Sequence, residues 1–321
     1  MTATSLSFFY GCSSSSSGTT SGNDAGDPGD DSGSTDDSGQ TIDDGGVPSD
    51  GGHDVPDANG PKAHLRIETG NLTTGNNQSY TNGEGARIFE GIKADVILIQ
   101  EFNVGDDSTT AVRAFVDSVC GTDCYYYRED GANIPNGIIS RYRIVTSGFW
   151  HDTAVTDRDF SWAQIDIPGP RDLFAISTHL LTSSATNRNI QANEIVTQIQ
   201  ANVHDEYVVL GGDFNTATRD EDCLTTLGAV FDTSGPYPKD GDGNDNTNAP
   251  RNKPYDWVVV SPDLRQFQIP VTIGATDYDT GLVVDTRVYS PIEDIAPAMA
   301  TDSAATNMQH MSVVKDFAVP E

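Results

Sequence analysis

The first 60 residues of the chain contain no lysine and no arginine. They hold eleven aspartates among long runs of serine, glycine, threonine and proline. Such a segment buries too little apolar surface to offset the entropy of the chain. We therefore predict a disordered acidic tether over residues 1–60. The remaining stretch, 61–321, is about 260 residues long, which is enough for one α/β domain with a large core.

Positive charge is scarce in the chain as a whole. There are 18 lysines and arginines against 48 aspartates and glutamates, which gives a formal net charge of −30 at pH 7. The eleven aspartates of the tether account for −11, so −19 remains on residues 61–321. This balance argues against a protein that holds polyphosphate through a broad basic surface. It does not exclude an enzyme that meets phosphate through a bound cation.

No apolar run reaches the length of about 20 residues that a membrane-spanning helix needs. The beginning nevertheless resembles the end of a bacterial lipoprotein signal, because the segment Leu6-Ser7-Phe8-Phe9-Tyr10-Gly11 precedes Cys12 and five serines follow. No basic segment precedes it and its apolar part is short, as in a truncated signal. We expect Cys12 to be lipidated and the protein to be exported, as a lipoprotein on the cell envelope or secreted. An ordinary disordered tail is the alternative.

Cysteine is rare, with four in the chain. Cys120 and Cys124 are separated by three residues and can close a small disulfide in an oxidising compartment. A zinc site is disfavoured, because no second cysteine pair or nearby histidine completes four ligands. Cys223 has no obvious partner and is interpreted as a buried thiol.

Polar residues follow four apolar runs that are predicted to be buried strands, over residues 65–68, 96–99, 173–177 and 207–210. They are Asn71, Glu101, His179, Asp213 and Asn215. Active sites of α/β sheets form just outside the carboxyl ends of strands, where loops converge on a rigid support. The repetition at equivalent strand ends therefore predicts one assembled site.

Apolar residues at i, i+3, i+4 and i+7 predict helices over 109–119 and 187–203, with a shorter one over 86–92. Further strands are predicted over 125–127, 137–140, 160–167, 256–260 and 312–317. Two consecutive strands, over 160–167 and 173–177, have no helix between them, so the sheets must be mixed or antiparallel. If the strands near Asp256 and His310 run antiparallel to the first four, both residues join the same edge.

The segment 240–246 reads Asp-Gly-Asp-Gly-Asn-Asp-Asn and looks like a calcium loop. It lacks the glycine at the sixth position and the glutamate at the twelfth that complete an EF-hand. We interpret it as a solvated loop, with weak Ca²⁺ binding as the alternative.

The predicted cluster combines hard oxygen ligands with imidazoles. Glu101, Asp213, Asn215 and Asn71 suit Mg²⁺ or Mn²⁺, with Ca²⁺ as a further candidate. His179 and a second histidine, at position 310, can donate to phosphoryl oxygens or exchange protons near neutral pH. A metal, carboxylates, amides and imidazoles together are what in-line attack of water on phosphorus requires.

The motifs resemble the endonuclease/exonuclease/phosphatase superfamily, the family of DNase I-like enzymes, over nearly all of residues 63–319. The most specific are Gln100-Glu101 after an apolar strand and Gly212-Asp213-Phe214-Asn215. The resemblance implies a four-layer α/β sandwich, with two mixed sheets packed face to face and helices outside. It also implies metal-dependent cleavage of a phosphate ester, with Glu101 as the principal metal ligand and Asn71 beside it.

The same resemblance implies the roles of the remaining residues. Asp213 would orient or activate the attacking water, and Asn215 would hold that water or a phosphoryl oxygen. His179 would contact the phosphate, and Asp256 would order the site. His310 would act as general base or stabilise the charged transition state. A further residue, Arg158, matches a position where the family places a phosphate-binding arginine.

Two departures from the family pattern stand out. The family usually has Asp before the last histidine, but here Gln309 precedes His310. A neutral amide cannot stabilise an imidazolium as a carboxylate does. We predict that His310 has a lower pKa than is usual for the family, or that it uses Asp256 instead. The second departure lies near Asn136, where nothing acidic is expected to pair with His179.

Three functions are compatible with these motifs. The leading hypothesis is a nuclease acting on DNA or RNA outside the cytoplasm, with a local rim of cations that contact phosphate: Arg141, Arg143, Arg158, Arg251 and Lys253. A second enzyme hypothesis is hydrolysis of a phospholipid headgroup, as in phospholipases C and sphingomyelinases, or of a small phosphorylated metabolite, with Phe149 and Trp150 as apolar lipid contacts. The third is a non-catalytic binding domain. We expect a monomer that reaches a membrane only through its N-terminal anchor.

Overall fold

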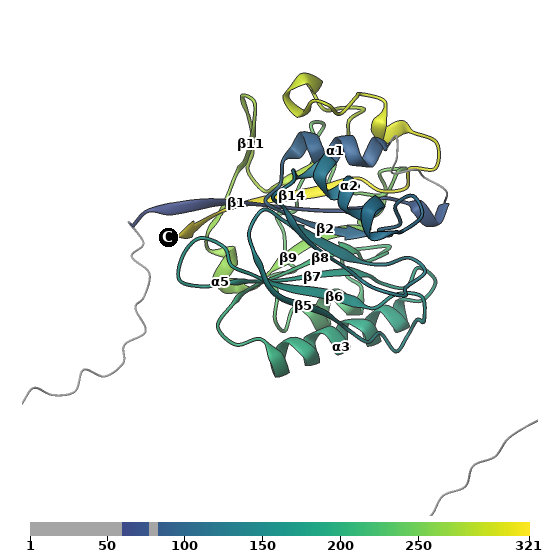
Figure 1. The fold of residues 1–321 in the computed structure, drawn as a ribbon, viewed down its shortest axis with the longest axis vertical. Helices are drawn as coiled ribbons and strands as arrows, with labels where there is room; N and C mark the ends of the chain where they lie inside the picture. The colour runs from purple at the N-terminus through teal and green to yellow at the C-terminus, as the bar shows by residue number, and fades with distance from the viewer. Residues whose placement is uncertain (1–59, 77–82) are drawn as a thin grey trace, which may run out of the picture. The chain divides into compact units, whose positions relative to one another are not determined.

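Two β-sheets packed face to face, with helices on both outer faces, make up the fold (Figure 1). The computed structural model describes residues 60–76 and 83–321. Cys12 and residues 1–59 lie outside the described residues, so the predictions of lipidation and of a tether stay predictions. The four-layer α/β sandwich expected from the sequence is confirmed, with two sheets and flanking helices.

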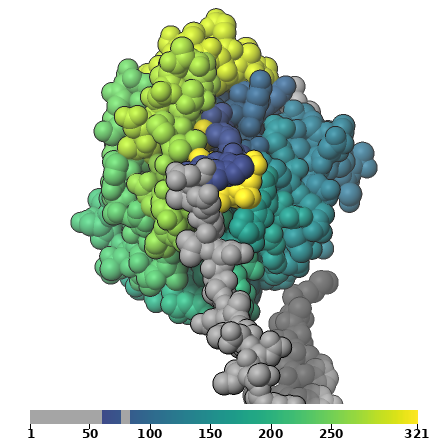
Figure 2. Space-filling model, turned by 90° about the vertical axis from the view of Figure 1, so that its left-hand side faces the viewer, coloured from purple at the N-terminus to yellow at the C-terminus, as the bar shows by residue number. Residues whose placement is uncertain are grey.

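The first sheet has seven strands and is mixed. Its members in spatial order are β10 (Gln268–Ile269), β14 (Ser312–Pro320), β1 (Lys62–Asn71), β2 (Val96–Gln100), β4 (Gly137–Ser140) and β3 (Tyr125–Arg128), and β13 (Leu282–Val284) also pairs with β14. β1 is parallel to β2 but antiparallel to β14. Figure 2 shows the purple start of β1 beside the yellow end of β14, where residue 62 pairs with residue 320.

The second sheet has five strands. They are β5 (Ile144–Trp150), β6 (Phe160–Ile165), β7 (Leu173–His179), β8 (Tyr207–Asp213) and β9 (Asp256–Val260), which lie in that order. β7 and β8 are parallel, and the other neighbours are antiparallel. A separate hairpin is formed by β11 (Val271–Ile273) and β12 (Thr276–Tyr278).

The helices complete the outer layers. The α-helices are α1 (Glu84–Ile92), α2 (Thr109–Val119), α3 (Ala185–Asn202), α4 (Asp222–Leu227) and α5 (Pro262–Arg265), and the 3₁₀ turns are η1 (Thr74–Asn76), η2 (Ile292–Ile295) and η3 (Asp302–Ala304). α1 and α2 pack on the first sheet, whereas α3 and α4 pack on the second. In the described part of the chain, no helix has the length and apolarity to cross a membrane.

Both faces of the central strands are buried, which explains their continuous apolar sequences. In β2, Val96 and Leu98 face the layer between the two sheets, and Ile97 and Ile99 face the helices α1 and α2. The layer between the sheets is built almost entirely from aliphatic side chains. The polar residues at the strand ends therefore stand on a dry support.

The periodic patterns placed the main elements well. The helix predicted over 109–119 has these bounds, and the other two predicted helices begin or end within two residues of their predicted limits. The strand β5 was missed, because it is an edge strand whose side chains are mostly exposed and therefore lack an apolar pattern. β7 and β8 are longer than predicted, so that His179 and Asp213 are their last residues.

The structure joins Cys120 and Cys124 in a disulfide, and Cys223 is a buried free thiol. The two residues considered for lipid contact have different surroundings. Phe149 is 50% exposed, but Trp150 is buried and stacks on a phenylalanine of β7. An apolar pair at this position is therefore not available to a lipid.

Glu68 is a glutamate buried beneath the helical layer. Its Oε1 accepts a hydrogen bond of 2.8 Å from the Ser312 hydroxyl, while Oε2 has no partner among the described residues. Burial raises the pKa of Glu68 to about 8, and the hydrogen bond and Arg66 offset only part of this. The side chain is therefore held as a neutral acid at neutral pH.

We predict that Glu68→Gln stabilises the protein in a pH-dependent way. An unfolded glutamate ionises near its ordinary pKa of 4.5, but the folded one stays protonated up to about 8. Between these limits the wild type loses about 1.4 kcal/mol of unfolding free energy per pH unit, a loss that glutamine avoids. Urea denaturation at a series of pH values should show the advantage of the variant growing over this window.

The exposed Glu90 of α1 offers a matched control. Glu90→Gln should leave the pH dependence of stability as it is in the wild type. A constant difference between Glu68→Gln and the wild type over the whole window would contradict the prediction.

Candidate active site

Strand pairing brings the predicted residues to one edge of the sandwich. In the second sheet, His179 at the end of β7 lies beside Asp213 at the end of β8, and Asp213 lies beside Asp256 at the start of β9. In the first sheet, Asn71 ends β1 beside the end of β2. His310 precedes β14, which is antiparallel to β1. The antiparallel arrangement that would unite these positions is therefore present.

The backbone at the strand ends is unusual in ways that the motifs explain. Glu101 and Asn215 have φ values of 56° and 53°, in the left-handed region that non-glycine residues rarely adopt. Gly212 has a φ of 155°, and a Cβ on it would overlap the carbonyl oxygen of Thr178 on the neighbouring strand. Glycine is required at this point because β7 and β8 approach closely there.

The carboxylate of Asp213 is the centre of the site. Its Oδ2 lies 3.1 Å from Nδ2 of Asn71, 3.1 Å from Nδ2 of Asn215 and 3.2 Å from Nε2 of His179. Nε2 of His310 is 3.5 Å away. Burial raises the pKa of Asp213 to about 7, and the adjacent Asp256 adds to the shift. The carboxylate can therefore accept a proton near neutral pH.

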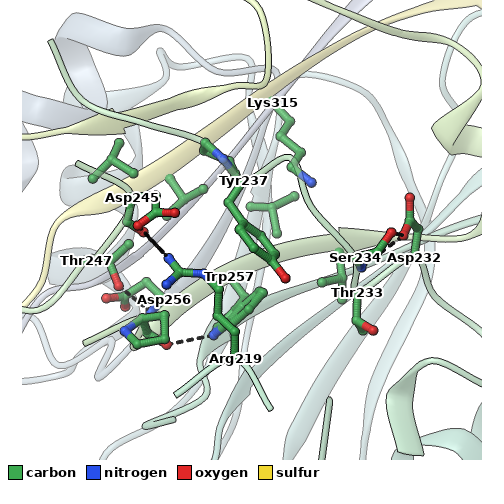
Figure 3. A pocket seen from close by; sticks show the side chains of 16 residues that line it. Arg219, Asp232, Thr233, Ser234, Tyr237, Asp245, Thr247, Asp256, Trp257 and Lys315 are labelled. Carbon is green, nitrogen blue, oxygen red and sulfur yellow. Dashed lines mark hydrogen bonds and ion pairs between the residues drawn. The ribbon is translucent and has the colours of Figure 1, made fainter. Parts of the chain in front are cut away.

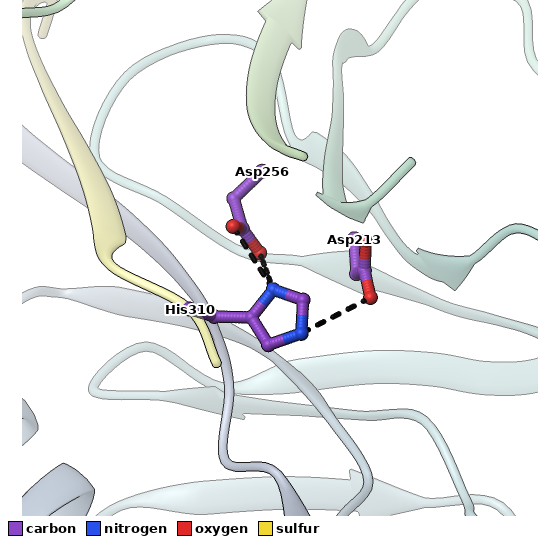
Figure 4. Close-up of side chains that lie close together, drawn as sticks. All are labelled: Asp213, Asp256 and His310. Atoms are coloured by element: carbon purple, nitrogen blue, oxygen red, sulfur yellow. Dashed lines mark hydrogen bonds and ion pairs between the residues drawn. The ribbon is translucent and has the colours of Figure 1, made fainter. Parts of the chain in front are cut away.

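His310 is held between two carboxylates (Figure 4). Its Nδ1 lies 3.1 Å from both carboxylate oxygens of Asp256, and Nε2 faces Asp213. Burial alone would lower the pKa of His310, but the two carboxylates outweigh it and raise the pKa to about 9. The imidazole is therefore an imidazolium at neutral pH.

This arrangement decides between the two alternatives expected for His310. The second alternative is what the structure shows, because Nδ1 of His310 uses Asp256 as its partner and the pKa of the imidazole is raised from its ordinary value of 6.5. The Gln309 side chain is exposed, and among the described residues no hydrogen bond joins it to the imidazole. The residue before the histidine does not set its charge, because Asp256 supplies the carboxylate from another strand.

His179 has the opposite electrostatic character. Burial, together with Arg158 and His310, lowers its pKa well below the ordinary value. The expectation that it lacks a carboxylate partner is wrong, because its Nε2 pairs with Asp213. Its Nδ1 is buried without a hydrogen bond in the described structure and lies 4.0 Å from Oε1 of Glu101. A neutral imidazole thus presents one nitrogen to the site.

An acidic residue does stand next to Asn136. Glu129 lies across the hairpin, and its Oε2 accepts a hydrogen bond of 3.2 Å from the backbone N–H of Asn136. This carboxylate supports the hairpin and makes no contact with His179. The sequence offered no sign of the pairing, because the two residues meet only through the turn between β3 and β4.

Glu101 and Asn71 form the other half of the site. Oε1 of Glu101 accepts a hydrogen bond of 3.1 Å from Nδ2 of Asn71, and Oε2 accepts one of 2.6 Å from the backbone N–H of Gly75. The amide of Asn71 therefore bridges the carboxylates of Glu101 and Asp213. Its oxygen accepts from the backbone of Thr73, which leaves one lone pair for a cation.

Arg158 is buried and has a structural task. Its Nε donates to the carbonyl oxygen of His179 at 2.5 Å, and Nη2 donates to that of Leu180 at 3.2 Å. Nη1 lies 3.1 Å from the carboxylate of Asp157. The guanidinium thus fixes the chain just after β7, while the residue also lines the site.

The site opens into a cavity of about 850 Å³. The predicted site residues that line it are Glu101, His179, Asp213, Asn215, His310 and Arg158. Loop residues that the motifs did not indicate complete the rim, among them Asn248, Asn307 and Thr182. Tyr255 also lines it and packs on the His310 ring at 5.8 Å between centroids. The one sign in the sequence that Tyr255 belongs to the site was its position directly before Asp256.

The predicted rim of cations is largely absent from this cavity. Of those five residues, Arg158 alone lines it. Arg141 and Arg143 lie at the far ends of the strands, near Asp95 and Asp166, and Arg251 is paired with the carboxylates of Asp240 and Asp285. Lys253 lies over the ring of Tyr255. The error arose because closeness to a motif in the sequence was taken for closeness in space.

The loop 240–246 is closed by an arginine. Oδ1 of Asp240 accepts from the backbone of Asp242 and Asn244, and Oδ2 pairs with the guanidinium of Arg251. A cation of the protein itself thus neutralises this carboxylate. The arrangement agrees with a solvated loop rather than a calcium site.

The residues of the site fit a hard divalent cation. The carboxylates of Glu101 and Asp213 converge on the amide of Asn71. Burial is the main cause of the raised pKa of Asp213, and the negative charge of Asp256 adds to it, so a cation nearby would stabilise the ionised form. Atoms of Asp213, Asp256 and His310 that can bind a metal lie within 4.8 Å of one another. At that second position a metal would have to replace the proton of His310, since an imidazolium cannot be a ligand.

Residues 76–291 match the model of the endonuclease/exonuclease/phosphatase family. The match spans more than half of the chain, and the chain therefore belongs to the endonuclease/exonuclease/phosphatase family. Enzymes of this family are metal-dependent phosphoesterases, which is the class of this protein. Asn71 and His310 lie outside the matched range, and it is the fold that brings them to Asp213.

Solved structures show the same fold. An endonuclease/exonuclease/phosphatase from Bacteroides vulgatus is 20% identical, with a TM-score of 0.55, and the match covers 81% of this chain and 100% of that one. A functionally unknown conserved protein from Enterococcus faecalis V583 is 14% identical, with a TM-score of 0.56 and coverages of 80% and 100%. A truncated Caenorhabditis elegans TDP2 is 18% identical, with a TM-score of 0.50 and coverages of 80% and 98%. No curated protein matches the chain by sequence.

We predict that Asp256→Asn lowers the pKa of His310 from about 9 to below its ordinary value of 6.5. The substitution removes the nearer carboxylate but keeps an acceptor for Nδ1, and burial then favours the neutral ring. Titration of the histidine ring resonances by NMR in metal-free protein measures this shift. Gln309→Ala is the matched control and should leave the pKa unchanged. A His310 pKa in Asp256→Asn that stays near the wild-type value of about 9 would refute the role of Asp256 as the partner of His310. A lowered His310 pKa in Gln309→Ala would refute it as well.

Proposed function

We propose that this protein hydrolyses compact phosphodiesters by in-line attack of water with the help of a divalent cation. The observation that supports this choice is the charge around the site. Among the described residues of the cavity lining, Arg158 is the one arginine or lysine, and it is engaged by two carbonyl oxygens and Asp157. A long polyanion such as duplex DNA depends on many phosphate contacts outside the reacting group. A headgroup phosphodiester or a small metabolite needs only the reacting phosphate to be held.

The chain's own residues suit the proton transfers of this reaction. Asp213, with its pKa near neutrality, accepts a proton from the attacking water as general base. Asn71 and Asn215 hold its Oδ2 by their amide groups. The His310 imidazolium faces the same oxygen through Nε2 and stabilises negative charge that develops on the phosphoryl group. Asp256 keeps that imidazolium charged.

Glu101 and Asn71 are the residues that would hold the cation. When bound there, Mg²⁺ or Mn²⁺ would supply positive charge to a phosphoryl oxygen, in addition to that of the His310 imidazolium. The neutral His179 orients Asp213 through Nε2. With Asp213 ionised as the base, the proton of the neutral His179 ring lies on Nε2 and is donated to Oδ2 of Asp213.

We predict that the full chain hydrolyses a small chromogenic phosphodiester in Mg²⁺ or Mn²⁺ and not in EDTA. Asp213→Asn should lower the rate by at least about 100-fold, which is the usual effect of losing a general base. Arg143→Ala, which removes an exposed cation at the far end of the sheet, should keep the wild-type rate.

The substrate class is tested on the same preparation. Supercoiled plasmid, RNA and vesicles of choline and ethanolamine phospholipids are compared with the chromogenic diester at equal phosphate concentration. Hydrolysis of the small diester or the headgroups, with plasmid and RNA left intact, is the expected result. Nicking of the plasmid at a higher rate would reverse the choice in favour of the predicted nuclease. Silence on all substrates in both metals would favour the binding-domain hypothesis.

A further inference from the structure

A second cavity lies on the other side of Asp256 from His310. It is bounded by β9, β13, β14 and the segment 232–238, and it is lined by valines together with Tyr237, Trp257 and Lys315 (Figure 3). Asp256 belongs to its wall, and Thr247, which accepts a hydrogen bond of 2.7 Å from the Asp256 backbone, does too. The cavity is therefore adjacent to the active site but distinct from it.

Lys315 is the unusual member of this lining. It stands in β14 between Val313 and Phe317, whose side chains belong to the dry layer between the two sheets. Only 8% of Lys315 is exposed. In Figure 3 its amino group points between Tyr237 and the Asp232–Ser234 segment. No hydrogen bond or ion pair joins the amino group to another described residue.

The other charged residues of the lining all have partners. Asp232 pairs with Arg265 at 3.1 Å, and Asp245 pairs with Arg219 at 3.2 Å. Asp256 pairs with His310, as shown above. Lys315 is therefore the one unpaired charge that the described lining contributes, and it is positive.

An unpaired ammonium in such surroundings is unfavourable, because it loses part of its water of hydration and no hydrogen bond from a described residue replaces what is lost. Burial lowers the pKa of Lys315 to about 8, Arg265 adds to the shift, and Asp232 opposes it. An amine with this pKa is still largely protonated at neutral pH. An anion beside it would supply the missing counter-charge.

The size of the cavity limits the anion. Its central space is about 20 Å³, which is room for one or two water-sized particles. The lining combines the apolar side chains of Val258, Val283 and Val313 with hydroxyl groups, among them those of Thr233, Ser234 and Tyr237. We propose that this cavity binds a compact monovalent anion of the size of chloride at the amino group of Lys315.

A crystal of the full chain grown without halide and soaked in bromide tests the position directly. Anomalous scattering should place a bromide ion against Nζ of Lys315 in the wild type, and the peak should be absent in Lys315→Met. Methionine has a similar length and no charge, and it suits the apolar walls, so this variant is expected to fold.

Solution measurements test the affinity and the selectivity. Chloride is titrated against gluconate at constant ionic strength, while the ¹³Cε resonance of Lys315 reports its pKa. Saturable binding of chloride should raise this pKa by about one unit. It should also raise the unfolding temperature of the wild type and of the control Lys253→Met, but not that of Lys315→Met.

Three results would overturn the proposal. One is a pKa and an unfolding temperature that respond to ionic strength alone, which would mean that Lys315 is simply a buried amine. Another is a bromide peak that has no counterpart in the solution titration. The third is a response to acetate without a response to chloride, which would contradict the size argument. None of these readouts depends on the catalytic activity, so failure here leaves the proposed phosphodiesterase untouched.

Discussion

The arrangement of the site depends on the contacts of one buried carboxylate, that of Asp213. Its Oδ2 lies within 3.2 Å of side-chain nitrogen atoms of Asn71 from the first sheet and of His179 and Asn215 from the second. One oxygen atom thus joins the edges of two sheets whose facing surfaces are mostly aliphatic. Because the carboxylate is buried, these shared contacts at one oxygen hold the imidazoles and amides in fixed positions relative to one another.

A chain of hydrogen bonds beneath the site connects β2 of the first sheet to β7 of the second. The side chain of Gln100 donates to the hydroxyl of Ser177 at 2.9 Å, and that hydroxyl donates to the carbonyl oxygen of Ile99 at 2.8 Å. These groups lie one residue below Glu101 and two below His179. The left-handed backbone of Glu101 and of Asn215 is thus held by a rigid base, which is how strained conformations persist at active sites.

Electrostatics connects the acidic composition to the chemistry of the site. The arginines near the cavity are used to hold backbone carbonyls and internal carboxylates, as Arg158 and Arg251 show. Positive charge for a phosphate must therefore come from the His310 imidazolium and from a bound cation. The same scarcity makes the unpaired Lys315 conspicuous, since elsewhere in the described fold the buried cations are matched by carboxylates.

Local patterns in the sequence indicated most of the long strands and the main helices, because buried strands are continuously apolar and amphipathic helices repeat at a helical period. The resemblance of the motifs to a known family implied the four-layer sandwich and named the candidate site residues. Gly212 and the residues after it were recognisable because the backbone geometry of that turn admits few alternatives.

Only the tertiary structure decided which charges meet. The partner of His310 is Asp256 from another strand and not its neighbour in the chain, Glu129 faces Asn136 rather than His179, and Arg141 and Arg143 lie far from the cavity. Pairing of charges depends on distances across strands and sheets, and the order of residues along the chain does not contain those distances.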